Sequence, residues 1–443
     1  MPSKTVFFCL STLVFVAVLF GLAVSAHAQT ETVIHTFDGA DGYNPIAGLV
    51  RDSAGNLYGT TFDGGTRNAG TVFELTPTAN GWKESVIYNF SGDDGAGPMA
   101  GLIFDAAGNL YGTTASGGNL GSYYCHGVGC GEVFRLSRGS TGVWQITPLY
   151  QFIGFADGDQ PQAGVVFDSA GNLYGTTVAD GLSTCFVQFN GCGVVFKLTP
   201  PAPNRPWMET VIHSFTGGSD GENPAAGLLI DAAGNLYGTN MYGGFGCTYG
   251  CGVAFELSPT STGAWNFSVL HSFAGLMDGA FPSAALISDS AGNLYGTTVR
   301  SGFANCVYFG SGGCGTIFEL SLTKSGHWKD TTLYEFTGGL DGALPLAPLV
   351  LDSAGNLFGT TGYGGTKVVK GGACAQDGQG GCGVVFELQP TSGSWELTTL
   401  FIFDGRYDGG SPTAGLVLDS AGNLYGTTTG NSTGTGVVFK VTP

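Results

Sequence analysis

Charged side chains are scarce in this 443-residue chain: they make up 11% of it, and only 15 are lysine or arginine. Against these stand 33 aspartates and glutamates, which gives a formal net charge of −18 at pH 7. Because nucleic acids are bound by clustered basic side chains, this composition argues against a DNA or RNA partner.

Helical periodicity and the motifs of known catalytic sites are also missing. No segment repeats its apolar residues at the spacing of an amphipathic helix. The sequence contains no nucleophile motif, zinc-protease motif or phosphate-binding loop. Its 78 glycines and 12% aromatic residues are typical of many short strands joined by tight turns.

A long apolar run occurs at the start of the chain. It extends from Thr5 to about Ser25, with Lys4 before it and the small-residue pattern Ala26-His27-Ala28 after it. This order predicts a secretory signal peptide over residues 1–28, followed by one domain over residues 29–443. An uncleaved membrane anchor is the alternative, because the run is long enough to span a bilayer. We expect a secreted or periplasmic monomer that has no membrane contact after cleavage.

One stretch, of the form DSAGNLYGTT, occurs seven times with small variations. Its first residues are Asp52, Asp105, Asp168, Asp231, Asp289, Asp352 and Asp419. Each unit holds four pieces of strand length and composition, which in the third unit read AGVVFD, GNLYGTT, CGVVFKLTP and WMETVIHSF. Seven such units predict an all-β fold, a seven-bladed β-propeller of four-stranded blades. An open β-solenoid is the alternative, but its repeats are usually shorter.

The two ends of the chain predict how the ring closes. The segment ETVIHTF, which begins at Glu31, matches the fourth strand of the other units, and the last unit ends after its third strand. We therefore expect residues 32–37 to pair with the last blade, which would remove an open sheet edge. A tryptophan precedes the fourth strand of the other units, at Trp82, Trp144, Trp207, Trp265, Trp328 and Trp395.

The order P-x-x-A-G-L-V-x-D-x-x-G-N-L-Y-G-T-T resembles the repeat of NHL-type propellers. It resembles more closely the GloVer tandem repeat of exported bacterial proteins, the choice-of-anchor family, over about residues 32–443. The resemblance implies that the AGLVFD strand is innermost and the tryptophan-led strand outermost. It also implies that the loops from fourth to first and from second to third strands share one face. It implies no activity, and the missing C-terminal anchor favours a freely diffusing form.

Ten cysteines beyond Cys9 form five close pairs, one in each of units 2 to 6. The pairs are Cys125 with Cys130, Cys185 with Cys192, Cys247 with Cys251, Cys306 with Cys314, and Cys374 with Cys382. Because export favours oxidation, we expect disulfides that close the loops between second and third strands. Zinc is the alternative, but one pair supplies only two of the four ligands that structural zinc needs.

Every unit also carries Asp-Gly-x-x-Pro. The aspartates are Asp41, Asp94, Asp157, Asp220, Asp278, Asp341 and Asp408. One interpretation is a turn that proline ends; the other is a ring of carboxylates that holds calcium near the channel mouth. No other cofactor is indicated. Seven copies favour the turn, because a single ion needs only a few ligands.

One position of the fourth strand is histidine in some units and tyrosine or phenylalanine in the others. His35, His213 and His271 stand where Tyr88, Tyr150, Tyr334 and Phe401 stand in other units. This exchange indicates that the position needs a flat ring for packing, so we expect no catalytic histidine there.

The loops bounded by cysteines differ most between the units, and they carry aromatic residues. These are Tyr123, Tyr124, Phe186, Phe189, Tyr249, Tyr308 and Phe309. Either the rings pack back on their blades or they bind a glycan or protein partner. The sequence therefore indicates a non-catalytic binding or scaffolding propeller. The alternatives are a polysaccharide lyase or glycosidase that uses acids at the channel mouth, and a structural envelope component.

Overall fold

The computed structural model describes residues 30–125, 127–182, 185, 191–202, 205–300, 302, 306, 312–365, 381–430 and 434–443. Within these ranges the chain forms strands, bridges, turns and bends. Across the same ranges there is no helix with the length and apolarity that a membrane crossing requires.

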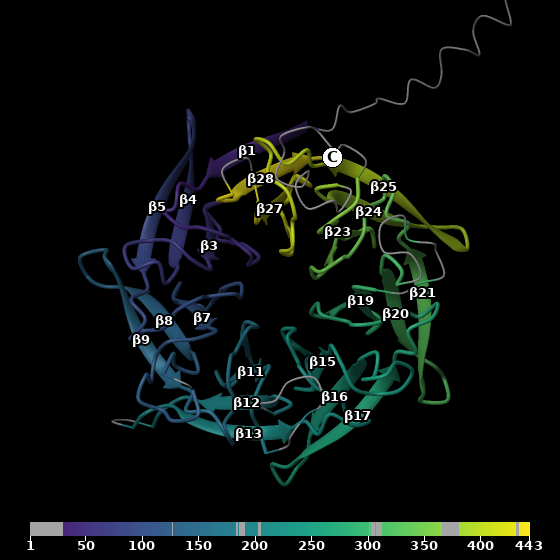
Figure 1. The fold of residues 1–443 in the computed structure, drawn as a ribbon, viewed down its shortest axis with the longest axis horizontal. Coiled ribbons are helices and arrows are strands. Elements are labelled where there is room, and N and C mark those ends of the chain that lie inside the picture. Colours follow the sequence, from purple (N-terminus) through teal and green to yellow (C-terminus); the bar gives the residue numbers. More distant parts are fainter. Residues whose placement is uncertain are drawn as a thin grey trace, which may run out of the picture.

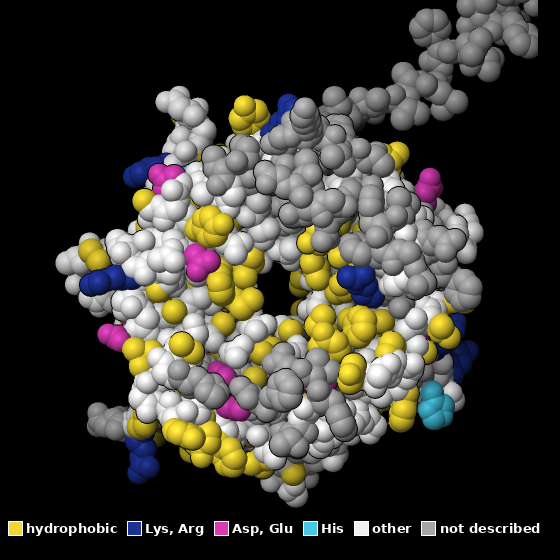
Figure 2. Space-filling model, in the orientation of Figure 1, with side chains coloured by type: hydrophobic (Ala, Val, Ile, Leu, Met, Phe, Trp, Pro, Cys, Tyr) yellow, Lys and Arg dark blue, Asp and Glu magenta, His cyan; other side chains and the backbone are white. Residues whose placement is uncertain are grey.

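The strands form seven separate four-stranded antiparallel sheets around a central opening (Figures 1 and 2). Blade 1 holds β2 (Val50–Arg51), β3 (Leu57–Thr61), β4 (Thr71–Thr78) and β5 (Gly81–Asn89). Blade 2 holds β6 (Ile103–Phe104), β7 (Leu110–Thr114), β8 (Glu132–Arg138) and β9 (Trp144–Gln151). Blade 3 holds β10 (Val166–Phe167), β11 (Leu173–Thr177), β12 (Val194–Thr199) and β13 (Met208–Ser214). Blade 4 holds β14 (Leu229–Ile230), β15 (Leu236–Asn240), β16 (Val253–Pro259) and β17 (Trp265–Ser272).

The remaining blades repeat this order. Blade 5 holds β18 (Ile287–Ser288), β19 (Leu294–Thr298), β20 (Thr316–Leu322) and β21 (Trp328–Glu335). Blade 6 holds β22 (Val350–Leu351), β23 (Leu357–Thr361), β24 (Val384–Thr391) and β25 (Ser394–Ile402). Blade 7 holds β26 (Val417–Leu418), β27 (Leu424–Thr428) and β28 (Val437–Thr442), and it takes its outer strand β1 (Thr30–Thr36) from the other end of the chain. The predicted seven-bladed propeller is confirmed.

The N-terminal strand closes the ring as the sequence predicts. β1 runs antiparallel to β28, with Thr30 opposite Thr442 and Thr36 opposite Val437. Figure 1 shows β1 beside β28 at the place where the two ends of the fold meet. The last blade therefore has the same four strands as every other blade, and no edge is left unpaired at the junction.

The innermost strands are shorter than the predicted AGLVFD segments, since each contains only two residues. Neighbouring blades converge at the opening, and the glycines of this segment permit a close approach between them. A Cβ on Gly101 would lie 3.2 Å from the carbonyl oxygen of Gly48 in the preceding blade. This crowding leaves little room for longer pairing near the axis.

The second strand of each blade is fully buried and explains why GNLYGTT is repeated. A Cβ on its glycine, for example Gly59, would lie 2.5 Å from the ring of Phe73 on the third strand, so glycine is needed for packing. The first threonine of each GTT donates a hydrogen bond to an alanine carbonyl in the next blade. These pairs are Thr60 with Ala100, Thr113 with Ala163, Thr176 with Ala226, Thr239 with Ala284, Thr297 with Ala347, Thr360 with Ala414, and Thr427 with Ala47. The repeat thus contains one hydrogen bond for every junction between blades, including the closing junction.

Candidate functional site

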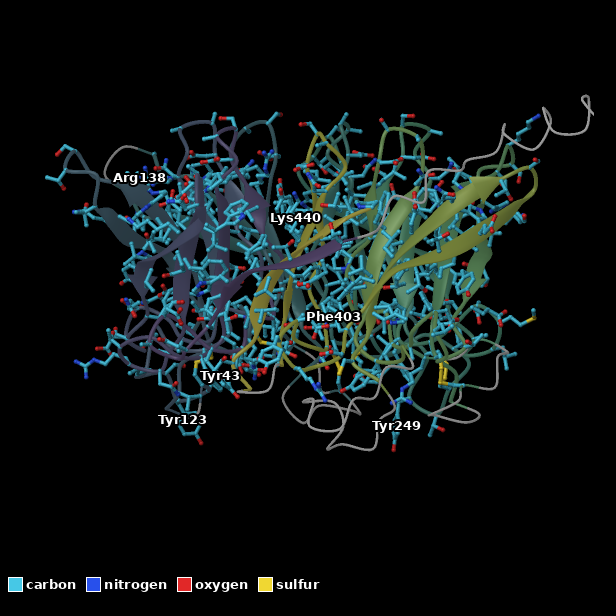
Figure 3. All side chains as sticks on the ribbon, turned by 90° about the horizontal axis from the view of Figure 1, so that it is seen from above. Tyr43, Tyr123, Arg138, Tyr249, Phe403 and Lys440 are labelled. Atoms are coloured by element: carbon cyan, nitrogen blue, oxygen red, sulfur yellow. A yellow bond between two sulfur atoms is a disulfide. The ribbon has the colours of Figure 1, made fainter. Side chains whose placement is uncertain are left out.

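The propeller has two distinct faces, seen edge-on in Figure 3. Tyr43, Tyr123 and Tyr249 lie on one face, with the loops that join fourth to first and second to third strands; we call it the loop face. Arg138 lies on the opposite face, with the DSAGN turns and the hairpins between third and fourth strands; we call it the turn face. The predicted sharing of one face by the two kinds of loop is confirmed.

The DSAGN aspartates hold tight turns on the turn face. In unit 1, Oδ1 of Asp52 accepts hydrogen bonds from the backbone N–H groups of Ala54 and Asn56, at 2.9 and 2.8 Å. Its Oδ2 accepts from the Asn56 amide at 2.8 Å and from the Tyr58 hydroxyl at 3.3 Å. Gly55 completes the turn with a φ of 92°. In these contacts the aspartate serves the turn itself.

The Asp-Gly-x-x-Pro aspartates also accept hydrogen bonds in turns, but their partners include the rings. Tyr150 donates its hydroxyl hydrogen to Oδ2 of Asp157 at 2.9 Å, and the Tyr88 hydroxyl donates to Asp94 in the same way. In the His units, Nε2 of His35 lies 2.8 Å from Oδ2 of Asp41. The interpretation that this position needs only a flat ring for packing was therefore incomplete. Most of these rings also carry a polar atom that lies within hydrogen-bond distance of the aspartate.

Unit 6 departs from this pairing because Phe401 has no polar atom to offer. The carboxylate of Asp408 accepts the backbone N–H groups of Asp404 and Gly405, at 2.9 and 3.1 Å. Burial and the neighbouring Asp404 raise the pKa of Asp408 to about 6. Glu31 of β1 lies close to both acids, and burial together with their charges raises its pKa to about 7.

The described residues offer three groups whose potential metal ligands lie within 4.8 Å of one another. One combines His35, Asp41 and Glu84, and the other two contain cysteines that are disulfide-bonded. Calcium prefers cages of six to eight oxygen atoms. None of the three groups is such a cage, and the seven aspartates are spread around the ring, one for each junction between blades.

Four of the predicted disulfides lie within the described residues. They join Cys125 to Cys130, Cys185 to Cys192, Cys247 to Cys251, and Cys306 to Cys314. Cys374, the predicted partner of Cys382, lies outside the described residues.

The second cysteine of each pair also forms a backbone hydrogen bond with the next unit. Its carbonyl accepts a hydrogen bond from the residue before the proline of the following unit, as Cys314 does from the N–H of Leu344 at 2.8 Å. Leu344 has a φ of 56°, a conformation that this contact helps to hold. Units 1 and 7 make the same bond without a cysteine, through the carbonyls of Ala69 and Thr435, so this contact between blades belongs to the repeat and not to the disulfides.

Three of the predicted loop rings lie in described residues, and all three face solvent. The exposed fractions of Tyr123, Tyr124 and Tyr249 are 89%, 50% and 59%. The interpretation that these rings pack back on their blades is therefore wrong for Tyr123 and Tyr249, whereas Tyr124 packs one side of its ring on a neighbouring loop. Phe186, Phe189, Tyr308 and Phe309 lie outside the described residues.

Tyr123 and Tyr124 belong to a larger apolar surface on blade 2. The Tyr124 ring stacks on Phe155, with centroids 5.2 Å apart and 25° between the planes, and Tyr123 meets Tyr124 edge-on at 5.6 Å. We call these three residues the ring platform. Phe155 is 53% exposed and was not predicted from the sequence, because it lies in the fourth-to-first loop, away from any cysteine.

Several bonds hold the platform in place. Oδ2 of Asp180 accepts the Phe155 N–H at 2.6 Å, and the N–H of Gly181 donates to the Phe155 carbonyl at 2.6 Å. The Ser122 hydroxyl donates to the carbonyl of Ile153, which links the two loops. Cys125, bonded to Cys130, directly follows Tyr124. These bonds hold the backbone of the two loops that carry the rings, which lowers the entropic cost of binding.

The family comparison agrees with this architecture: the Gloeobacter/Verrucomicrobia repeat matches residues 17–202 and 182–373. The chain belongs to the Gloeobacter/Verrucomicrobia repeat family. The GloVer resemblance is thereby confirmed, and the repeats of this family build a propeller here. No curated protein sequence matches the chain.

Solved structures with a similar fold share little sequence with this family member. A carbohydrate-active enzyme of family AA12 from Trichoderma reesei is 14% identical with a TM-score of 0.43, covering 94% of this chain and 96% of its own. A putative 6-phosphogluconolactonase from Bacteroides uniformis is 14% identical with a TM-score of 0.47. The match covers 82% of this chain and 86% of the lactonase chain. A putative oxidoreductase (glucose dehydrogenase) from Thermus thermophilus is 13% identical with a TM-score of 0.39. The match covers 94% of this chain and 100% of the oxidoreductase chain. Similarity at this level carries no conclusion about activity.

Proposed function

We propose that this protein is an exported, non-catalytic binding propeller that recognises a glycan through the ring platform of blade 2. The observation that carries the proposal is the stacked, solvent-facing arrangement of Tyr124 and Phe155 with Tyr123 beside them. Export is supported by the predicted signal peptide and by the four disulfides.

A sugar fits the chemistry of this surface. Exposed aromatic faces stack on the C–H faces of sugar rings, while the hydroxyls of the sugar need polar neighbours. The platform supplies the aromatic faces, and Asn119 lies in the same loop as Tyr123 and Tyr124. A protein partner is the other ligand that aromatic anchors commonly bind, and the experiment below distinguishes the two.

Retention on insoluble cellulose, chitin and xylan tests the proposal. We expect at least one polysaccharide to retain the protein, and Tyr124→Ala or Phe155→Ala to weaken retention about tenfold, since one stacked ring contributes about 1.4 kcal/mol. Tyr407→Ala is the matched control, because Tyr407 is 82% exposed but lies on blade 6. Failure of all polysaccharides to retain the protein, or equal losses in all three variants, would contradict the proposal.

The enzymatic alternative has a separate readout in the same experiment. A lyase or glycosidase that uses channel-mouth acids would release reducing ends from the polysaccharide, and Asp157→Asn or Asp408→Asn would stop the release. The described aspartates of this set accept hydrogen bonds within turns, which supports a structural role. Retention without release supports the binding proposal, and the absence of both supports a structural envelope component.

The hypothesis that the Asp-Gly-x-x-Pro carboxylates hold a calcium ion can also be tested. We expect the melting temperature to be the same with calcium chloride and with EDTA, because the Asp-Gly-x-x-Pro carboxylates already accept backbone and ring hydrogens. A rise of several degrees in calcium would support an ion at one of these positions. We further propose a monomer without a nucleic-acid or membrane partner; the acidic composition supports the first of these two absences.

A further inference from the structure

Three potential metal ligands meet at the junction where the ring closes. His35 lies on β1, Asp41 lies in the loop that follows β1, and Glu84 lies on β5 of blade 1. One donor atom of each lies within 4.8 Å of the donor atoms of the other two. Figure 1 shows β1 and β5 close to each other at this junction. We call these three residues the closure cluster.

Two of the three side chains are already oriented by their surroundings. Nε2 of His35 lies 2.8 Å from Oδ2 of Asp41, and the imidazole packs edge-on against Phe37 with ring centres 4.8 Å apart. Oδ1 of Asp41 accepts the N–H hydrogen of Asp38 at 2.9 Å. In metal sites, contacts of this kind behind the ligands fix the directions in which the ligands point.

Glu84 contributes a carboxylate that its own surroundings do not satisfy. Its Oε1 is shielded from solvent and has no hydrogen-bond partner among the described residues. Burial raises the pKa of Glu84 to about 7; the imidazole of His35 acts in the opposite direction, and the charge of Asp41 adds to the rise. A bound cation would satisfy both this oxygen and the charge that burial disfavours.

The repeat itself does not require this combination of residues. At the junction of blades 3 and 4, Phe267 stands at the glutamate position and stacks on His213, with ring centres 4.2 Å apart. At the junction of blades 4 and 5, the corresponding residues are His271, Asp278 and the shorter Asp330, and their donor atoms do not all come within 4.8 Å of one another. Among the described residues, histidine, aspartate and glutamate of these positions gather so closely only in the closure cluster.

The donor set of the closure cluster suits zinc. It consists of one imidazole nitrogen and two carboxylates, whereas calcium prefers six to eight oxygen ligands. Ligand atoms of a tetrahedral zinc lie about 3.3–3.5 Å from one another. The observed donor atoms, with one pair at 2.8 Å and all within 4.8 Å, need to move by about 1 Å to reach this arrangement. The side chains of His35 and Asp41 are 19% and 18% exposed, so water can occupy the fourth position.

We propose that His35, Asp41 and Glu84 bind a zinc ion, which braces the ring at its closing junction. The ion takes the place of the proton shared by Nε2 of His35 and Oδ2 of Asp41, and this proton goes to solvent. Because the ligands come from β1, the loop after it and β5, the ion ties the N-terminal strand to blade 1. This site is independent of the ring platform, whether or not the loop face binds a glycan.

Titration of the untagged mature protein with zinc chloride, after EDTA treatment and dialysis, tests the proposal. We expect a calorimetric titration to find one zinc ion per chain, and the melting temperature to rise by a few degrees at saturation, because the ion binds only the folded state. Calcium chloride should have neither effect. Glu84→Leu copies blade 6 and His35→Tyr copies blades 1, 2 and 5, so both substitutions suit the repeat. Each should weaken zinc binding at least tenfold and remove the rise in melting temperature.

His213→Tyr is the matched control, because it makes the same exchange at a junction that lacks the third ligand. It should keep the zinc affinity of the parent. The inference is overturned if no zinc binds below millimolar concentration, if Glu84→Leu and His35→Tyr keep full affinity, or if His213→Tyr loses as much affinity as they do.

Discussion

Asp289 illustrates how a single carboxylate holds a turn of this propeller. It accepts the N–H groups of Ala291 and Asn293 at 2.8 and 2.9 Å, the Asn293 amide at 2.8 Å and the Tyr295 hydroxyl at 3.1 Å. Partial burial pushes its pKa upward, but these hydrogen bonds outweigh that effect and hold the pKa below its ordinary value. The ionised form is therefore the one that stabilises the turn.

We expect Asp289→Ala to lower the free energy of unfolding by about 2 kcal/mol at pH 7, because several hydrogen bonds are lost together. A carboxylate whose pKa is lowered by folding stabilises the fold fully when the pH is above its unfolded-state pKa. This stabilisation is lost as the pH falls through the folded-state pKa. The difference between variant and parent should therefore shrink towards pH 3. Urea unfolding at the two pH values measures it, and Asp289→Asn, which keeps one acceptor oxygen, should cost less. Equal stability of parent and alanine variant at pH 7 would refute the assignment.

At the scale of elements, the outer strands differ in one position that faces the neighbouring blade. Two residues after the tryptophan position stand Glu31, Glu84, Glu209 and Asp330, whereas three other units have Ile146, Phe267 and Leu397. Burial raises the pKa of each of the three glutamates to about 7 and that of Asp330 to about 6. Nearby acids of the adjacent blade, such as Asp157 beside Glu209, act in the same direction.

These shifts predict a pH dependence of stability. A carboxyl whose folded-state pKa is raised binds more protons when folded than when unfolded, so stability falls as pH rises from about 4.5 to about 7. We expect the melting temperature to be higher at pH 5 than at pH 8, and Glu209→Gln to reduce that difference. Calorimetric scans across this range are the measurement, and Glu396→Gln, which removes an exposed carboxylate, is the matched control. A melting temperature that rises with pH would show that the buried acids are ionised without cost.

The disulfide loops give a second prediction at this scale. Since eight cysteines form the four described bonds, thiol titration of the denatured, unreduced mature protein should find at most two reactive thiols among its ten cysteines. Replacing both Cys125 and Cys130 with serine should lower stability by about 2 kcal/mol, because the closed loop is short. Ten reactive thiols would rule out the disulfides.

At the scale of the whole molecule, stability depends on a closed ring. β1 covers the edge of β28, and the Thr427 hydroxyl donates across the same junction to the carbonyl of Ala47 at 3.2 Å. A ring lacking β1 would expose an unpaired strand edge, which recruits other chains.

A chain that begins after residue 36 should therefore melt at a lower temperature and associate into dimers or larger species. Light scattering during size-exclusion chromatography and a thermal scan measure the two effects. A chain that begins at residue 29 keeps β1 and serves as the control, with the parent's melting temperature expected. A stable monomer after removal of β1 would mean that closure contributes little.

The sequence alone determined the number of blades, ring closure by the first strand and the pairing of the described cysteines, while the inner-to-outer strand order and the shared loop face came from the family resemblance. These features follow from turn chemistry and strand patterns that act within a few residues, and seven copies make them readable. Tertiary structure alone decided what depends on contacts between blades: Phe155 stacked on Tyr124, Glu209 facing Asp157, and Arg138 reaching Glu74, 64 residues earlier. Such contacts depend on how closed blades sit side by side, and no local pattern in the chain encodes that distance.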